Sequence, residues 1–280
     1  MTFDPDRVRA DIERLRVADA DLRVFGAIGH RHRLRPCLTA EELAAAEAFF
    51  RVTFPDEYRT FLLRVGNGGA GPFYGVFPLV RADGGWRSEG DSGDMFGDVA
   101  APVPHVDAWN PAADPMWKWP ERDWSADETL YDAEYEAWRE KFDPVYGGPE
   151  HTAGAISVCD VGCAKRKWLV VSGPAAGQIW ADDRADYEGL SPLLDPAGRR
   201  HTFGSWYTSW LAQTLAEVAD GSASTPARHP DSDFVERLGP EDSARPCAES
   251  GCNRGAVRFS VLCKPHHFRM IQHRPYPFAE

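Results

Sequence analysis

The spacing of apolar residues predicts a helix close to the start of the chain. Val8, Ile12 and Leu15 recur at helical spacing and would share one face. Asp4 is suited to cap this helix and Pro5 to occupy its first position, where the missing N–H costs nothing. The basic run at 30–33 that follows is expected to be loop with a solvated surface.

A pair of helices is predicted next, over residues 39–65. Thr39 and Glu42 have the spacing of a capping box, which marks the start of the first helix. The second helix is expected from Pro55 and ends at Gly66, which we expect to adopt the left-handed conformation. Its buried face would be Tyr58, Phe61, Leu62 and Val65.

A longer helix with two contrasting faces is predicted from Ser125, with Glu128 completing a second capping box. Pro144 is expected to close this helix. The face expected to point inward is aromatic and consists of Tyr131, Tyr135, Trp138 and Phe142. The face expected to point outward is an acidic stripe of Asp132, Glu136 and Glu140. This stripe is a candidate partner-binding surface, although its acids would equally serve solubility.

Short β segments are predicted between and after these helices. They cover residues 75–80, 155–160, 167–172 and 178–181, and a final helix covers 203–219. Residues 83–98 are rich in glycine and acids and are expected to form a loop. Helices followed by hairpin-linked strands and another helix favour the α+β class, with a mostly antiparallel sheet backed by helices.

The composition changes after this body. Residues 221–245 are dominated by Gly, Ser, Pro, Arg and Asp, which is typical of a linker. We therefore predict an α+β domain over residues 1–220, a linker over 221–245 and a small zinc knuckle over 246–280.

The charge balance favours a protein partner over nucleic acid. The formal net charge is −12, whereas residues 246–280 carry five Lys or Arg against two Asp or Glu. An acidic body repels nucleic acid and favours basic partners, although solubility alone would explain such a charge. We see no signal-peptide pattern at the start and no apolar run of about 18 residues that would span a membrane. We therefore expect a cytoplasmic protein whose six cysteines are thiols or metal ligands.

Three patches together resemble the SUKH superfamily, which includes yeast cell-wall-synthesis regulators and bacterial toxin-immunity proteins. The first patch spans residues 38–43 and 54–62, with the step Phe-Pro-Asp-Glu-Tyr beginning at Phe54. The second is the glycine turn and strand of residues 66–79. The third comprises Gly162-Cys163, residues 168–180 and residues 203–211. The resemblance covers residues 22–218.

This resemblance implies a fold and a mode of action. The implied fold is α+β, with a mostly antiparallel sheet backed by helices. The implied action is binding of a partner protein through a variable surface, most often immunity against a toxin. The motifs that carry the resemblance are structural and name no particular partner.

Cys247, Cys252, Cys263 and His266 form the clearest chemical signal in the sequence. Thiolates and imidazole are the ligands that zinc prefers, and four of them complete a closed tetrahedral site. The surrounding residues hold few apolar groups, so a structural zinc ion would supply the missing stability. The pattern resembles small Cys/His knuckles found beside phage and bacterial nuclease domains, and His267 remains open as the fourth ligand. Arg and Lys around the site would give at most weak contact with nucleic acid.

Other constellations do not predict catalysis. Gly90-Asp91-Ser92-Gly93 resembles a trypsin-like nucleophile segment, but the residues before it are expected to be helical. Asp182-Asp183 with His201 are expected to lie on a surface turn. Cys159 and Cys163 are expected to be buried thiols. We therefore expect no catalytic residues and no enzymatic activity.

The function predicted from sequence is a non-enzymatic, toxin-immunity-type protein that neutralises a partner, such as a basic toxin, by binding it. Two alternatives remain open. One is an intracellular scaffold or regulatory protein with the same fold. The other is a nuclease-associated factor whose zinc knuckle contacts nucleic acid.

Overall fold

The computed structural model describes residues 3–82, 84–90, 97–118, 120, 128–223, 234–235, 238–258, 260–272 and 276. The chain divides into two compact units, Met1–Thr225 and Pro226–Glu280. None of the helices in the described ranges is both long and apolar enough to cross a membrane.

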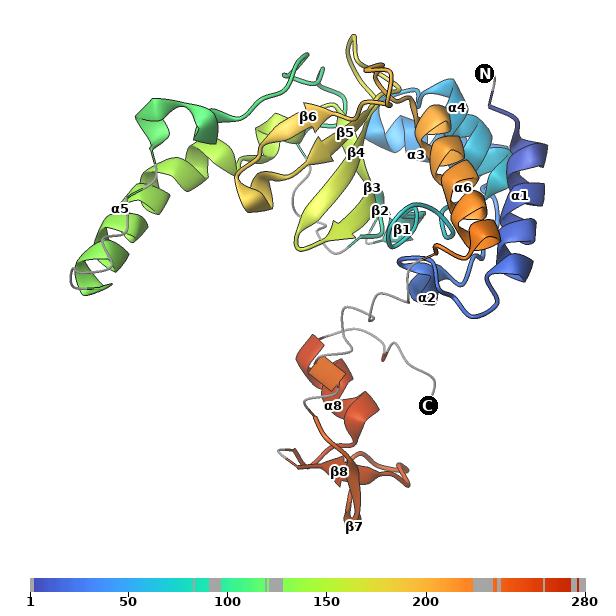
Figure 1. Ribbon diagram of the computed structural model, residues 1–280, viewed down its shortest axis with the longest axis vertical. Coiled ribbons are helices and arrows are strands. Elements are labelled where there is room, and N and C mark those ends of the chain that lie inside the picture. The colour runs from blue at the N-terminus through green and yellow to red at the C-terminus, as the bar shows by residue number, and fades with distance from the viewer. Residues whose placement is uncertain are drawn as a thin grey trace. The chain divides into compact units, whose positions relative to one another are not determined.

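Helices form one layer of the first unit (Figure 1). Their bounds are α1 Pro5–Ala18, α2 Ala27–His30, α3 Ala40–Phe50, α4 Asp56–Thr60 and α6 Phe203–Asp220, and α4 continues as a π-helical turn over Phe61–Val65. Asp4 caps α1, and the reciprocal hydrogen bonds between Thr39 and Glu42 form the predicted capping box of α3. Local signals therefore set the starts of α1 and α3.

Strands form the second layer, and all of them pair antiparallel. The main sheet has the order β3-β4-β5-β6, with β3 Ala155–Gly162, β4 Lys165–Val170, β5 Ile179–Asp182 and β6 Leu190–Pro192. A separate hairpin pairs β1 Leu79–Ala82 with β2 Gly85–Ser88. The α+β class and the antiparallel sheet are confirmed.

The main sheet is buried on both faces. Successive apolar side chains along its strands point to opposite faces, and each face packs against a hydrophobic cluster. Ile156, Leu169 and Ile179 belong to the larger core, which also contains residues of α1, α3, α4 and α6. Ala155, Trp168 and Trp180 belong to a second, smaller cluster on the opposite face of these strands. Aromatic rings join the helices within the larger core. Phe203 of α6 lies 5.0 Å from Tyr58 and 5.1 Å from Phe61, measured between ring centroids.

The segment between the hairpin and β3 adds an aromatic stack to the first unit. Its helix α5 spans Glu128–Tyr146, and short 3-10 turns cover Pro111–Ala113, Pro115–Trp117 and Pro149–Thr152. Ring centroids of Trp138 and Phe142 lie 4.6 Å apart, and those of Phe142 and Tyr146 lie 4.7 Å apart. Trp109 stacks on His151 at 4.0 Å. One face of α5 therefore consists of stacked aromatic rings, as its sequence pattern predicts.

The second unit contains a hairpin and the helix α8 among its described residues. The hairpin pairs β7 Glu241–Pro246 with β8 Gly255–Val257, and α8 spans Lys264–Gln272. The prediction of linker through residue 245 was wrong at its end, because β7 begins at Glu241. The hydrogen bonds of the β7–β8 ladder and of the Glu241 side chain hold these residues in the unit.

Three expectations about local structure were wrong. Residues 85–88 form a strand, not a loop, because Trp86 is buried and the Ser88 hydroxyl donates to the Ser157 carbonyl oxygen at 2.7 Å. Gly66 ends the helix in an extended conformation (φ 175°), and a Cβ there would lie 2.8 Å from the Arg35 carbonyl oxygen. Pro144 lies inside α5, within the last turn before Tyr146.

Burial also contradicts two expectations. The run at 30–33 is not fully solvated, because His32 is buried with its Nε2 atom 2.7 Å from Asp19 Oδ2, and burial lowers the pKa of His30 to about 3. Cys163 is exposed in the turn after β3, whereas Cys159 is buried and donates its S–H to the Pro72 carbonyl oxygen at 3.1 Å.

Candidate metal centre

Four potential metal ligands converge at one end of the hairpin in the second unit. Cys247 follows β7, Cys252 lies in the connection between β7 and β8, and Cys263 directly precedes α8. His266 lies in the first turn of α8. Their ligand atoms all lie within 4.8 Å of one another. Residues spread along this stretch of chain are thus brought to one point by a tight hairpin followed by a helix.

The distances fit one tetrahedral metal ion. Metal–sulfur bonds of about 2.3 Å in a tetrahedron place two sulfur atoms about 3.8 Å apart, and the Cys252 and Cys263 Sγ atoms are 3.8 Å apart. His266 Nδ1 lies 3.3 Å from Cys247 Sγ and 3.2 Å from Cys263 Sγ. These are slightly shorter than the sulfur–nitrogen edge of about 3.6 Å expected for such a site. The cluster could therefore hold a metal ion after a small expansion.

Hydrogen bonds from the backbone around the cluster favour the thiolate form of Cys247. Burial disfavours ionisation of Cys247, but hydrogen bonds from the backbone N–H of Cys263 and from other donors outweigh it and lower the pKa to about 6. Burial raises the pKa of Cys263 to about 12. A cation bound among these sulfur atoms would favour the thiolate form of each.

His266, and not His267, has a ring nitrogen in the cluster. The His267 ring stacks on Phe234 with centroids 6.3 Å apart, and its Nδ1 atom is buried without a hydrogen-bond partner in the described structure. Phe268, fully buried beside it, also contacts Phe234 at 5.8 Å. His266 therefore faces the cluster, whereas the next two residues of α8 face the small apolar core.

Glu241 supports the cluster and was not identified from the sequence. Its carboxylate accepts hydrogen bonds from the Arg254 Nε–H at 3.0 Å and from the backbone N–H of Lys264 at 2.7 Å. It therefore ties β7 to the turn before β8 and to the start of α8, where a negative charge is also favoured by the helix dipole. The only sequence signal is an acidic residue ahead of the first cysteine, which is too common to stand out.

Several basic side chains near the cluster are engaged within the unit. Arg245 donates to the backbone carbonyl oxygens of Arg258 and Ser260, at 3.2 and 2.9 Å. Arg254 is held by Glu241. Each guanidinium therefore uses part of its five N–H donors within the unit, and the Glu241 carboxylate offsets the charge of Arg254.

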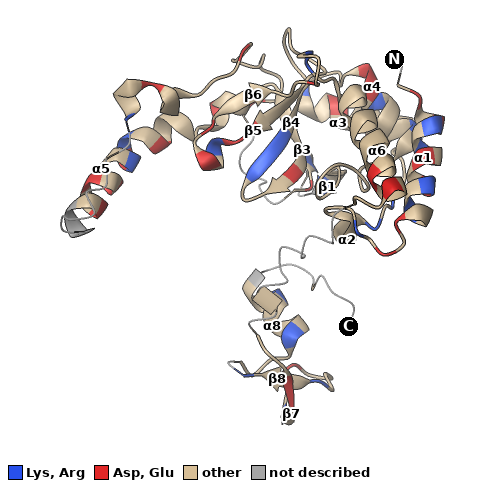
Figure 2. Cartoon of the chain, viewed as in Figure 1, with Lys and Arg blue, Asp and Glu red and all other residues tan. Residues whose placement is uncertain are grey.

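The acidic stripe on α5 lies outward, as its spacing predicts. Asp132, Glu136 and Glu140 are exposed, and Phe142 is buried. Figure 2 shows acidic residues along this helix. Glu136 pairs with Arg139 at 3.4 Å, so the stripe is partly neutralised at its centre.

Among the described residues, Asp182 and His201 are engaged with different partners. Asp182 is buried, contrary to the expected surface turn, and pairs with Arg184 at 2.7 Å and with the indole N–H of Trp168 at 3.0 Å. His201 Nδ1 instead lies 3.0 Å from the Ser205 hydroxyl. The segment at 91–93, and Ser125 of the expected α5 cap, lie outside the described residues.

A comparison with protein families matches most of the first unit to one family. The sequence model of the SMI1 / KNR4 family (SUKH-1) matches residues 37–181, which is more than half of the chain. The matched range runs from just before α3 into β5. Comparison with curated proteins and with solved structures gave no match. The Cys/His cluster lies outside the matched range.

Proposed function

Because the chain belongs to the SMI1 / KNR4 family (SUKH-1), we propose that it is a non-enzymatic module that neutralises a partner protein by binding it. The observation that carries this proposal is the family match across α3 to β5. It acts in the cytoplasm as an immunity-type protein. The separate engagement of Asp182 with Arg184 and of His201 with Ser205 supports binding over catalysis.

The contact for the partner is the acidic stripe on α5, and the partner presents a basic surface. Exposed carboxylates steer a basic partner during encounter, and neighbouring aromatic rings provide area that can be desolvated. Tyr131 and Tyr135, adjacent to the stripe, are half-buried with ring centroids 6.1 Å apart. Acid and aromatic groups therefore lie next to each other along one helix.

Co-purification with tagged protein from the native host identifies the partner. Replacing Asp132, Glu136 and Glu140 together by Lys should then slow association strongly at low salt and less at high salt, because salt screens charge steering. The matched control reverses three exposed acids elsewhere in the unit, Asp21, Glu41 and Asp220. The α5 contact would be refuted if the charge reversal on α5 left the association rate unchanged. It would also be refuted if the α5 reversal and the control reversal slowed association equally.

We also propose that the Cys/His cluster holds one structural zinc ion per chain. Three sulfur atoms and one imidazole nitrogen match the donor set that zinc prefers, and the 3.8 Å sulfur–sulfur distance matches a tetrahedral edge. The second unit has few fully buried apolar side chains among its described residues, so metal binding would contribute most of its folding free energy. Elemental analysis of purified protein should find near-stoichiometric zinc.

The exposed Cys163 provides a control for this zinc site. Cys263→Ser should abolish zinc binding and leave the first unit folded, because the cluster lies wholly in the second unit. Cys163→Ser removes a thiol outside the cluster and should keep zinc. Zinc-free wild-type protein from zinc-replete cells would contradict the proposal, as would equal zinc content in both variants.

The nuclease-associated alternative has less support. It requires basic groups beside the metal that can reach phosphates, and the ion pair with Glu241 offsets the charge of one of them, Arg254. A regulatory scaffold remains compatible with the family match and would differ only in the partner that co-purifies.

A further inference from the structure

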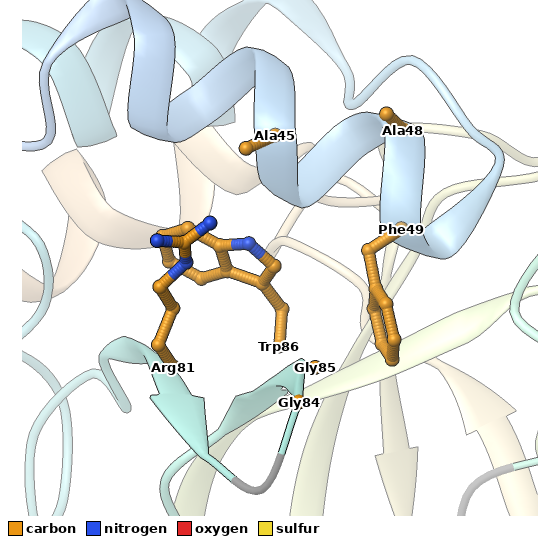
Figure 3. Close-up of a pocket in the computed structure, with 7 residues that line it drawn as sticks. All are labelled: Ala45, Ala48, Phe49, Arg81, Gly84, Gly85 and Trp86. Atoms are coloured by element: carbon orange, nitrogen blue, oxygen red, sulfur yellow. The ribbon is translucent and has the colours of Figure 1, made fainter.

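A groove of about 730 Å³ lies between α3 and the β1–β2 hairpin. Figure 3 shows the side chains around it, with those of α3 facing those of the hairpin across the open space. The lining residues are Ala45, Ala48, Phe49, Arg81, Gly84, Gly85 and Trp86. The groove lies within the family-matched range and is distinct from α5 and from the metal centre.

Small residues on both walls keep the groove open between two aromatic rings. Ala45 and Ala48 form the helical wall, and Gly84 has no heavy atom within 4 Å of the position a Cβ would take. A Cβ on Gly85 would lie 2.5 Å from the Phe49 ring, so glycine is required for this close approach. Phe49 is nonetheless 50% exposed, while Trp86 is 7% exposed. The space suits a large apolar side chain inserted between these walls.

Among the described residues that line the groove, Arg81 is the one with a charged side chain. Its guanidinium lies over the Trp86 ring, 5.6 Å from the ring centroid. Within the described part of the chain no carboxylate pairs with it. Glu47 of α3 is bonded to Arg59 at 2.7 Å, and Glu41 is exposed one turn before Ala45 without lining the groove.

We propose that this groove binds a protein segment in which a large apolar side chain is followed by a carboxylate. The apolar side chain enters between Ala48 and Trp86, and the carboxylate pairs with Arg81. The stacking on Trp86 holds the guanidinium at the edge of the groove and reduces the entropy lost on pairing. The groove is complementary in charge to an acidic segment, whereas the α5 stripe is complementary to a basic one. The inference does not depend on the proposed immunity role.

The test uses two peptides that differ in one group. Acetyl-Gly-Phe-Asp-Gly-amide and acetyl-Gly-Phe-Asn-Gly-amide are titrated into the ¹⁵N-labelled full-length protein, and amide and indole chemical shifts are followed. We expect shifts at Ala45, Gly84, Gly85 and Trp86, with the Asp peptide binding about threefold to fivefold more tightly, as for an exposed ion pair. Arg81→Gln should remove this preference.

Filling the groove tests the apolar contact separately. Ala48→Leu places a larger side chain at an exposed helical position and should weaken binding of both peptides about tenfold. Ala44→Leu, exposed on α3 but outside the groove lining, should not change binding. Equal affinity for the two peptides would indicate a purely apolar groove and overturn the proposal. The proposal would also be overturned if no chemical shifts changed at the groove. Self-association that Ala48→Leu abolishes would overturn it too, because that result would indicate a second copy of the chain as the occupant.

Discussion

Two tyrosines of the larger core have the same burial but opposite hydrogen-bonding environments. Tyr58 and Tyr207 are both 0% exposed. The Tyr207 hydroxyl donates to the buried Ala70 carbonyl oxygen at 2.6 Å. The Tyr58 hydroxyl has no hydrogen-bond partner in the described structure. Replacing each by Phe removes one oxygen atom and should change stability in opposite directions.

The size of each change in the free energy of unfolding depends on whether the removed hydroxyl makes a hydrogen bond. Tyr207→Phe leaves the Ala70 carbonyl oxygen without this donor, which should lower the free energy of unfolding by about 1–3 kcal/mol. Tyr58→Phe removes a buried hydroxyl whose desolvation is not offset by a hydrogen bond. This should raise the free energy of unfolding by about 1 kcal/mol. The two variants should therefore differ by about 2–4 kcal/mol.

Urea unfolding followed by tryptophan fluorescence measures this difference. All ten Trp residues lie between Trp86 and Trp210, so the signal reports the first unit. In thermal unfolding, each 1 kcal/mol should shift the midpoint by about 2–4 °C for a unit of this size. The reasoning is refuted if the two variants lose stability equally, because that would mean that Tyr58 has a hydrogen-bond partner.

Two further predictions concern ionisable side chains inside the first unit. Arg184→Leu leaves the buried Asp182 carboxylate without its ion-pair partner and should lower the free energy of unfolding by about 3–5 kcal/mol. Arg139→Leu, at an exposed ion pair, should change it by less than about 1 kcal/mol. Equal effects of the two variants in urea unfolding would contradict this. Burial lowers the pKa of His30 to about 3 and that of His105 to about 4, so the folded chain binds fewer protons than the unfolded chain, whose histidines titrate near about 6.5. The free energy of unfolding should therefore fall as pH drops from about 6.5 towards about 4, and His30→Gln should reduce this slope; an unchanged slope would count against it.

Much of the helical layer and the ligand set could be predicted from the sequence alone. The starts of α1 and α3 depend on cap residues within three positions of the helix, so the signal is local. The strands β3, β4 and β5 were predicted to within a few residues because their apolar runs are bounded by glycine turns. The four metal-ligand candidates could be named because cysteine and histidine spacing is itself the signal.

The tertiary structure decided what depends on segments distant in the chain. Residues 85–88 read as loop, yet they form β2 because Trp86 is buried and Ser88 bonds to a residue of β3. Glu241 supports the Cys/His cluster only because the hairpin brings it to the start of α8. The groove beside Arg81 exists because α3 packs on a hairpin whose glycine admits Phe49. Pairing between residues that are distant in the chain leaves no periodic or spacing signal, so only the folded chain determines it.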